Sequence, residues 1–138
     1  LRFLGDLFCV EYGWLFVIYG TNWLCNEREA HMHIHCVGLN HATAGLDLRE
    51  TLAFCAEQIQ AALARLGCGE GFDGIREMVI LSTCNRVEVY AVLSHTHSEV
   101  LLDFLAETRG VSLDALQRHT HRRTGLEAAR HLFRVAAG

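Results

Sequence analysis

The sequence contains no lysine, since all twelve of its basic residues are arginines. A lysine that forms a Schiff base, or that binds phosphate in a nucleotide-binding loop, is therefore excluded. The formal net charge of −4 also lacks the basic excess that proteins with a general affinity for nucleic acid usually show. Any contact with a nucleic acid must consequently be local.

The N-terminal region lacks a long apolar run. The apolar stretch at residues 14–19 is far shorter than the roughly 20 residues that a membrane helix needs. The region also lacks the small-residue cleavage site of a secretory signal peptide. A more regular pattern begins at Met32. We therefore expect residues 1–31 to be an extension outside the fold and residues 32–138 to form one domain, with no association with a membrane.

The cysteines form no Cys-x-x-Cys pair and no regular framework, which is typical of reduced thiols in a cytoplasmic protein. The six positions are Cys9, Cys25, Cys36, Cys55, Cys68 and Cys84. His-x-His pairs occur at His33 with His35, His95 with His97, and His119 with His121. No closing cysteine or carboxylate accompanies these pairs at a suitable spacing, so we expect no metal site.

The periodicity of the apolar residues predicts both strands and helices. The expected strands are residues 34–38, 78–81, 87–93 and, near the end, 116–121. The expected helices are residues 47–66 and 98–109, a short turn after Ser112, and a last helix that begins at Thr124. This order predicts the α+β class, as a ferredoxin-like split βαβ sandwich with an additional C-terminal helix.

The ends and faces of the helices follow from local signals. Asp47 with Glu50 and Thr124 with Glu127 resemble capping boxes, and Gly110 is expected to end a helix. The predicted apolar face of the first helix comprises Leu48, Leu52, Cys55, Ile59, Leu63 and Leu66. That of the last helix comprises Leu126, Leu132, Phe133 and Ala136.

A polar turn at residues 82–86 interrupts two apolar strands and carries Cys84. Turns of this kind often display reactive side chains. A nucleophilic cysteine needs thiolate character, which the nearby Arg86 could support. On spacing alone, however, an isolated cysteine such as Cys84 is more often a small buried apolar residue, as expected for the other five cysteines.

Three segments of the sequence resemble signature motifs of glutamyl-tRNA reductases. They read GLNHATAGLDLRE at residues 38–50, ILSTCNRVEVY at residues 80–90 and HLFRVAAG at residues 131–138. They occur in the order found in that family, and the resemblance covers residues 32–138. It is the N-terminal catalytic domain of the family that the chain resembles, truncated before the NADPH-binding and dimerisation domains.

The resemblance implies a reaction for this domain. It implies an NADPH-dependent reduction of glutamyl-tRNA to glutamate 1-semialdehyde, the first step of five-carbon tetrapyrrole (porphyrin) biosynthesis. Cys84 would attack the ester carbonyl, release the tRNA and hold the glutamyl group as a thioester, which hydride then reduces. His131 would act as a general acid or base beside the thiol, although a lone helical histidine is often only packed or solvated.

The same resemblance implies residues that bind the substrate. Arg86 would hold the side-chain carboxylate of the glutamyl group, unless it is simply a solvated arginine at a strand end. Thr83 and Asn85 would shape the pocket, and His41 and Thr43 would line it. Two departures from the family stand in the first motif, where Ala42 replaces a usual lysine and Gly45 a usual proline.

The Gly-x-Gly-x-x-Gly run of the chain, at residues 69–74, follows a predicted helix and precedes a predicted strand, which is the reverse of the order in a dinucleotide-binding fingerprint. NADPH is therefore expected to bind in a domain absent from the chain. Further expected partners of the whole enzyme are a second subunit in a homodimer and glutamate-1-semialdehyde aminotransferase. Two other functions stay open, namely a non-catalytic α+β binding domain and a thiol esterase. The basic segment at residues 118–123 could contact tRNA phosphate or be a solvated loop.

Overall fold

The structure is a computed structural model that describes residues 7–10, 14–20, 33–67, 72, 74–93 and 98–138. Its strands are β1 (Leu7–Val10), β2 (Trp14–Gly20), β3 (His33–Asn40), β4 (Ile75–Ser82), β5 (Arg86–Leu93) and β6 (His121–Thr124). Its helices are α1 (Leu46–Leu52), α2 (Ala56–Gly67), α3 (Glu99–Arg109), α4 (Leu113–His119) and α5 (Gly125–Ala137). None of the helices in these ranges is long and apolar enough to span a membrane.

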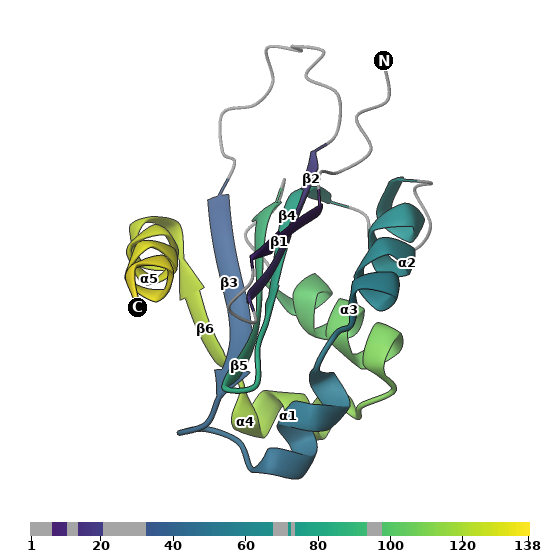
Figure 1. Cartoon of the computed structure of the whole chain (residues 1–138), viewed down its shortest axis with the longest axis vertical. Helices are drawn as coiled ribbons and strands as arrows, with labels where there is room; N and C mark the ends of the chain where they lie inside the picture. The colour runs from purple at the N-terminus through teal and green to yellow at the C-terminus, as the bar shows by residue number, and fades with distance from the viewer. Residues whose placement is uncertain (1–6, 11–13, 21–32, 68–71, 73, 94–97) are drawn as a thin grey trace.

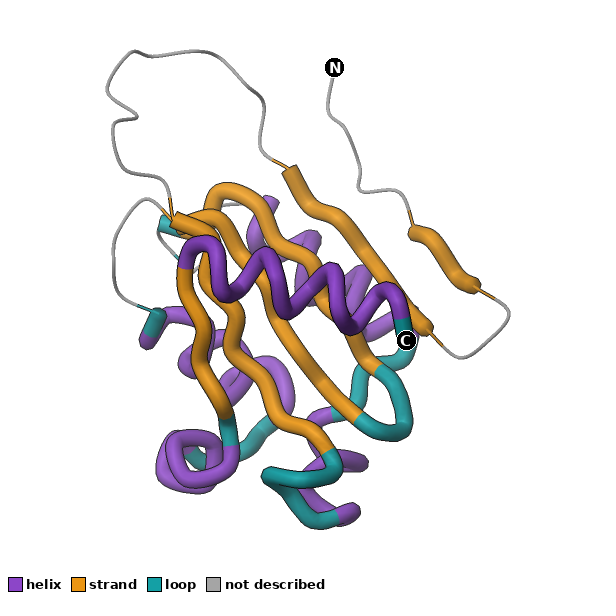
Figure 2. The backbone as a smooth tube through the Cα atoms, turned by 90° about the vertical axis from the view of Figure 1, so that its left-hand side faces the viewer, coloured by secondary structure: helices purple, strands orange, loops and turns teal. Residues whose placement is uncertain are grey.

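The strands form one antiparallel sheet in the order β1-β2-β4-β5-β3-β6. Within it β5 lies between β3 and β4, which the first two helices connect, and this is the split βαβ arrangement. Helices α1 to α4 cover one face of the sheet, and α5 lies across the other face (Figures 1 and 2). The predicted α+β sandwich with an additional C-terminal helix is therefore confirmed.

Strands β1 and β2 belong to the segment that we expected to lie outside the fold. β2 pairs with β4 from Leu15 opposite Ser82 to Gly20 opposite Glu77, and β1 pairs with β2. The backbone of these two strands thus extends the sheet by two strands beyond those predicted. The boundary of the domain at residue 32 stays a prediction.

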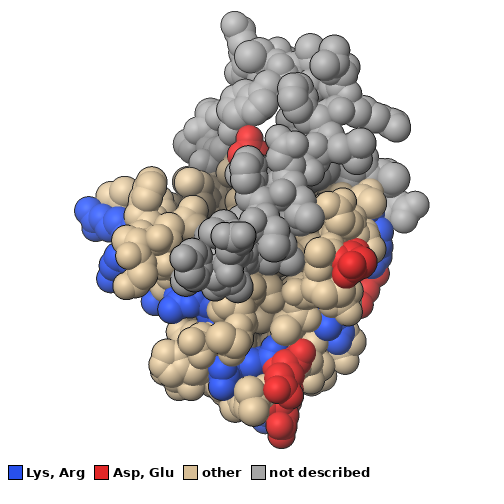
Figure 3. All heavy atoms as spheres, in the orientation of Figure 1, with Lys and Arg blue, Asp and Glu red and all other residues tan. Residues whose placement is uncertain are grey.

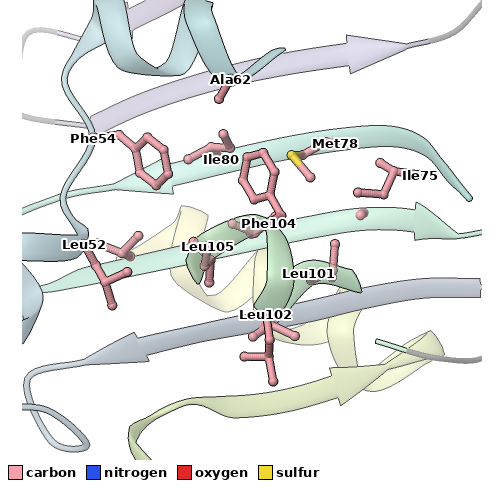
Figure 4. Packing of buried hydrophobic residues seen from close by; sticks show 14 of the residues in the cluster. Leu52, Phe54, Ala62, Ile75, Met78, Ile80, Leu101, Leu102, Phe104 and Leu105 are labelled. Carbon is pink, nitrogen blue, oxygen red and sulfur yellow. The ribbon is translucent and has the colours of Figure 1, made fainter. Parts of the chain in front are cut away.

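The main core lies between the sheet and helices α1 to α4. Every second residue of the central strands contributes, so that Val37 of β3 and Val89 of β5 are fully buried on this face. Leu102 and Phe104 of α3 belong to the same cluster of buried residues (Figure 4). A contiguous apolar layer of this kind is the dominant favourable contribution to the stability of a small domain.

The predicted helix over residues 47–66 is broken into α1 and α2. The break at residues 53–55 turns Phe54 into the core, where its ring stacks on that of Phe104 with the centroids 6.5 Å apart. The backbone N–H of Phe54 donates to Oγ of Ser82 at 2.9 Å. This bond to a strand distant in sequence replaces a bond within a helix, and periodicity alone could not reveal it.

The predicted strand over residues 116–121 is displaced toward the C-terminus. Helix α4 continues to His119, and β6 follows from His121 to Thr124. Ser112 caps α4 by accepting a hydrogen bond from the N–H of Ala115 at 3.3 Å, and Leu116 is fully buried beneath the helix. The predicted helical turn after Ser112 is confirmed, and a capped turn with a buried leucine explains why it extends.

The apolar face predicted for α5 is largely wrong, since Leu132 alone of its four residues packs against the cluster on the sheet. Leu126 and Phe133 are 66% and 74% exposed, whereas Ala128, His131 and Val135 face the sheet. These three recur at a helical spacing, and a histidine takes the central place because a carboxylate of the sheet binds it. Neither predicted capping box forms, since Asp47 lies inside α1 and Thr124 makes no side-chain cap, but Gly110 does end α3 with a left-handed φ of 64°.

Candidate active site

Cys84 lies at the tip of the turn that joins β4 to β5, and its side chain is exposed. The turn is closed by Thr83, whose N–H donates to the carbonyl of Arg86 at 2.9 Å. Oγ1 of Thr83 accepts hydrogen bonds from the N–H groups of Asn85 and Arg86, each at 3.2 Å. Because Thr83 organises three backbone bonds, the short polar motif presents the thiol from a defined turn.

The loop after β3 lies beside this turn. The N–H of His41 donates to the carbonyl of Asn85 at 2.9 Å, so two of the three signature segments are in direct contact. The loop itself is a compact turn, in which the carbonyl of Asn40 accepts hydrogen bonds from the N–H groups of Thr43 and Ala44, both at 3.0 Å. In the same turn, Oγ1 of Thr43 accepts a hydrogen bond from the N–H of Asn40 at 3.1 Å.

Arg49 of α1 is a second support of the turn. Its Nη1 donates to the carbonyl oxygen of Cys84 at 2.6 Å. At the other side of the loop, Nδ1 of His119 lies 3.0 Å from the carbonyl oxygen of Thr43. The backbone that carries Cys84 is thus held by side chains from α1, and the neighbouring loop by α4. The sequence motifs had indicated no role for Arg49.

Glu88 is a fully buried carboxylate on the face of the sheet that α5 covers. Its Oε2 accepts a hydrogen bond from the hydroxyl of Tyr90 at 2.6 Å. Its Oε1 lies 3.3 Å from Nη1 of Arg86 and 3.0 Å from Nε2 of His131. A buried carboxylate is tolerated only where such partners compensate for the loss of water. The sequence analysis did not single out Glu88.

Two histidines converge on this carboxylate from different elements. Nε2 of His121 in β6 lies 3.6 Å from Oε1 of Glu88, and the ring of His121 meets that of His131 edge to face, with centroids 5.3 Å apart. Burial lowers the pKa of His121, an effect that the charge of Glu88 partly opposes. His121 is therefore mainly neutral in this cluster at neutral pH, with its Nε2 turned toward Glu88.

Cys36 of β3 completes the cluster. Its side chain is fully buried, and its thiol lies in the same small group as Tyr90 and Ala128. Burial raises the pKa of the Cys36 thiol to about 12, and the charge of Glu88 adds to that effect. Burial also raises the pKa of Tyr90, so its phenol keeps the proton that it donates to Glu88.

The predicted site residues fall into two connected groups. Thr83, Asn85, His41 and Thr43 surround the backbone of Cys84 at one end of the sheet. His131 lies under α5, bound to Glu88, and among the described residues no hydrogen bond joins it to Cys84. Arg86 connects the two groups, since it follows the turn and contacts Glu88. A signal for Glu88 existed in the sequence, because a carboxylate at the centre of an apolar strand requires partners on its face.

The other cysteines differ in their surroundings. Cys36 is buried, as expected, but Cys55 is exposed at the break between α1 and α2, so its predicted place on an apolar helix face is wrong. Cys25 and Cys68 lie outside the described residues, as does the side chain of Cys9. Within the described part of the chain, Cys55 and Cys84 are the exposed thiols, which makes Cys55 a useful control.

An open depression of about 570 Å³ lies beside α5 and is lined by Arg123, Glu127, Arg130, Phe133 and Arg134. None of the predicted substrate residues lines it. On the face shown in Figure 3, arginines appear at several separate places, with acidic side chains beside the lower ones. Two of the arginines of the basic segment are paired with carboxylates, Arg118 with Asp114 and Arg122 with Glu99.

Comparisons with known proteins agree with this arrangement. The family model described as the N-terminal domain of glutamyl-tRNAGlu reductase matches residues 37–138. Among curated proteins, the chain is 43% identical over 107 residues to a glutamyl-tRNA reductase of Halorhodospira halophila. It is 42% identical over 107 residues to that of Pseudoalteromonas translucida and 41% identical over 109 residues to that of Microcystis aeruginosa.

These matches cover 78% of the chain but only 23% to 25% of the relatives. The chain therefore spans about a quarter of the length of the curated proteins that it matches. All three segments that carried the resemblance lie within or overlap the matched region, and so do Cys84, Arg86, Glu88 and His131.

Proposed function

The chain belongs to the glutamyl-tRNA reductase family through its N-terminal domain, and on that premise we propose that it carries the acyl-transfer site of such an enzyme. Cys84 is the nucleophile, and the acyl group that it receives is the glutamyl group of glutamyl-tRNA. The observation that carries this proposal is the exposed thiol at the tip of a turn that three bonds from Thr83 organise.

The proposed step is a transesterification. The sulfur of Cys84 attacks the ester carbonyl carbon, a C–S bond forms, and the bond to the terminal ribose oxygen of the tRNA breaks. The thiol proton ends on that leaving oxygen, so the products are a glutamyl thioester and the free tRNA. The exposed turn suits this step, because a large substrate can approach the thiol from solvent while Arg49 holds the backbone from behind.

Arg86 is proposed to bind the side-chain carboxylate of the glutamyl group. Its side chain is 23% exposed and stands two residues from Cys84. Glu88 contacts it through Nη1 alone, at 3.3 Å. A guanidinium carries five N–H donors in a planar fork, so a bond to Glu88 can orient it while another edge receives a carboxylate. Thr83, Asn85, His41 and Thr43 are proposed to form the walls of this pocket.

His131 is proposed to move the proton of the acyl transfer. Glu88 fixes the ring, because its Oε1 lies 3.0 Å from Nε2. A carboxylate partner orients an imidazole and stabilises its protonated form, which is the behaviour required of a general acid or base. Glu88 is then a positioning residue for both His131 and Arg86.

NADPH is the reductant that the family implies, but the residues of this chain do not fit it. Dinucleotides bind at the carboxyl ends of parallel strands, beside a glycine-rich turn that opens a helix. Every described strand pair is antiparallel, and the glycine run at residues 69–74 stands between α2 and β4, so it leads into a strand and opens no helix. We propose that the thioester is reduced by a part of the enzyme outside residues 1–138.

The remaining functional assignments rest on the family. We propose that the whole protein acts in the cytoplasm as a homodimer in tetrapyrrole biosynthesis. An aminotransferase that consumes glutamate 1-semialdehyde is the proposed partner, since the aldehyde product is reactive. The names of the relatives support a substrate of the glutamyl-tRNA class.

Intact-mass analysis tests the acyl transfer. The purified chain is incubated with glutamyl-tRNA, quenched in acid and compared with the variants Cys84→Ala and Cys55→Ala. We expect one glutamyl adduct on the original chain and on Cys55→Ala, and none on Cys84→Ala. Cys55→Ala is the matched control because it removes the other described exposed thiol.

Two results would contradict the proposal. An adduct that persists on Cys84→Ala would assign the acyl group to another residue. The absence of any adduct on a chain whose circular dichroism shows the folded state would mean that this domain does not carry out acyl transfer. Release of free glutamate without an adduct, if it depends on Cys84, would instead favour a thiol esterase.

A further inference from the structure

Three potential metal ligands meet under α5, although they come from three separate elements. Cys36 is on β3, His121 is on β6 and His131 is on α5, and their Sγ, Nε2 or Nδ1 ligand atoms all lie within 4.8 Å of one another. Cys36 and His131 are buried, and the side chain of His121 is only 14% exposed. Cysteine and histidine donors of this kind are the set that structural zinc sites use.

Glu88 lies beside the two histidines of this group, where its carboxylate can serve as a fourth donor once the side chains close around an ion. Its Oε1 lies 3.0 Å from Nε2 of His131 and 3.6 Å from Nε2 of His121. The other oxygen, Oε2, is engaged separately by the hydroxyl of Tyr90 at 2.6 Å. Tyr90 therefore orients the carboxylate of Glu88, as residues that hydrogen-bond to metal ligands commonly do.

Hydrogen bonding within the protein does not account for the whole cluster. Nε2 of His121 is buried, and in the described part of the chain it has no hydrogen-bond partner. A buried ring nitrogen without a partner costs free energy, and native structures usually compensate for it with water or an ion. Nε2 of His121 lies beside the thiol of Cys36 and the carboxylate of Glu88. These neighbours favour a cation, and not a further hydrogen-bond donor, as its missing partner.

The distances are compatible with tetrahedral coordination after a small closure. Zinc binds sulfur at about 2.3 Å and nitrogen or oxygen at about 2.0–2.2 Å, so its ligand atoms lie roughly 3.3–3.7 Å apart. The present separations reach at most 4.8 Å among the three ligands of the cluster. Closing the three-ligand group to that spacing requires its ligand atoms to move by about 1 Å.

The charges also match a divalent ion. Metal binding displaces the proton of the Cys36 thiol to solvent, and the resulting thiolate and the carboxylate of Glu88 together contribute two negative charges, which balance one Zn²⁺. Magnesium and calcium prefer sites made wholly of oxygen, whereas a mixed sulfur, nitrogen and oxygen set favours zinc. Arg86 remains at the edge of the cluster, on the same oxygen of Glu88.

We propose that Cys36, His121, His131 and Glu88 form a binding site for Zn²⁺ between the sheet and α5. This proposal does not depend on the acyl-transfer function. It has a consequence for it, however, because Zn²⁺ occupies the same nitrogen of His131 and the same oxygen of Glu88 that position the proton carrier. The metal-bound state is then a state in which His131 cannot move a proton.

Cobalt substitution tests the proposal without any measurement of activity. The chain is stripped of metal with a chelator and titrated with Co²⁺ under reducing, anaerobic conditions. A tetrahedral site with one thiolate produces intense visible bands and a thiolate-to-cobalt charge-transfer band in the near ultraviolet. Titration with Zn²⁺ should then abolish these bands at one equivalent per chain.

Variants assign the bands to this cluster. Cys36→Ala should lose the charge-transfer band, and His121→Gln should weaken Zn²⁺ binding by more than roughly tenfold, which is the smallest loss typical of outer partners of metal sites. Cys55→Ala and Cys84→Ala are the matched controls and should retain both the band and the affinity. His121→Gln keeps the test decisive if Cys36→Ala does not fold, because the His121 side chain is 14% exposed whereas Cys36 is fully buried.

Three outcomes would overturn the proposal. The first is a folded chain that shows no charge-transfer band with Co²⁺. The second is a band of full intensity in Cys36→Ala or an unchanged Zn²⁺ affinity in His121→Gln. The third is a band that disappears in Cys84→Ala, which would place the metal at the exposed thiol instead. None of these results bears on whether Cys84 accepts a glutamyl group.

Discussion

The two faces of the sheet are both covered by helices, yet they are built from opposite kinds of residue. On the side of α1 to α4, β5 presents Val87, Val89 and Ala91 to an apolar layer. On the side of α5, the alternate residues of the same strand include Glu88 and Tyr90, within a polar network. Strand β5 therefore contributes apolar residues to the core on one face and polar residues to the Glu88 network on the other.

The comparison also separates two kinds of burial. Burial of apolar area contributes about 25 cal/mol per Å² and needs no special geometry. Burial of the Glu88 carboxylate is favourable only because Tyr90, Arg86 and His131 surround it, and it becomes costly when one partner is lost. The α5 face is accordingly the face where small changes in geometry should have specific rather than general effects.

The largest expected effect is on the apolar face. Phe104→Ala should lower the free energy of unfolding by about 3–5 kcal/mol, because the ring is fully buried between Phe54 and Phe72 and its loss leaves a cavity. Urea denaturation followed by circular dichroism measures this. Phe133→Ala on α5 is the control, since that ring is 74% exposed and its removal should change stability by less than about 0.5 kcal/mol.

A second substitution tests how closely the α5 face is packed. Gly38→Ala should cost about 1–3 kcal/mol, because the added Cβ would lie 2.6 Å from the carbonyl oxygen of Val87 and from Cγ of Glu88. Gly45→Ala is the control, since nothing lies within 4 Å of its added Cβ. Equal stability of the two variants in thermal unfolding would show that β3 and β5 are more loosely packed than described.

The third substitution removes the charge at the centre of the polar face. Glu88→Gln should lower stability by about 2 kcal/mol, because an amide cannot accept from Tyr90, Arg86 and His131 in the same geometry. The imidazole NMR signals of His131 should shift at the same time. A control is Glu50→Gln, which changes an exposed carboxylate of α1. An undisturbed His131 signal would count against its contact with Glu88.

The smallest expected effect comes from a single hydroxyl. Tyr90→Phe should lower the free energy of unfolding by about 1 kcal/mol, since it deletes one hydrogen bond to Oε2 of Glu88 and leaves the ring in place. Chemical denaturation of both chains in parallel can resolve such a difference. The double variant Tyr90→Phe, Glu88→Gln is the control. If its loss in free energy of unfolding equals the sum of the losses of the two single variants, the two residues do not interact.

Much of the apolar face could be predicted from the sequence. The strands around Val37, Ile80 and Val89 and the helix with Leu101, Leu102 and Leu105 follow from alternation and helical spacing. The same reasoning failed for α5, where it chose Leu126 and Phe133 as the buried side. It failed because the bond between His131 and Glu88 determines which face of α5 turns toward the sheet. A prediction based on the spacing of apolar residues does not include a buried histidine.

The break between α1 and α2 shows the same limit on a smaller scale. The apolar residues over 48–66 continue at helical spacing, and only the bond from the N–H of Phe54 to Ser82 reveals where the helix stops. The two residues are 28 positions apart in the sequence. A rule based on neighbouring residues cannot include such a partner.

The sequence by itself determined the class of the fold and the local geometry of the turn at residues 83–86, because strand alternation and the bonds of Thr83 are interactions between near neighbours. Its three signature segments were also sufficient to predict the family. Only the tertiary structure decided that Cys36, His121 and His131 meet at Glu88. The physical reason is separation along the chain: His131 and Glu88 are 43 residues apart, and their contact exists only once β5, β3, β6 and α5 have assembled around one buried charge.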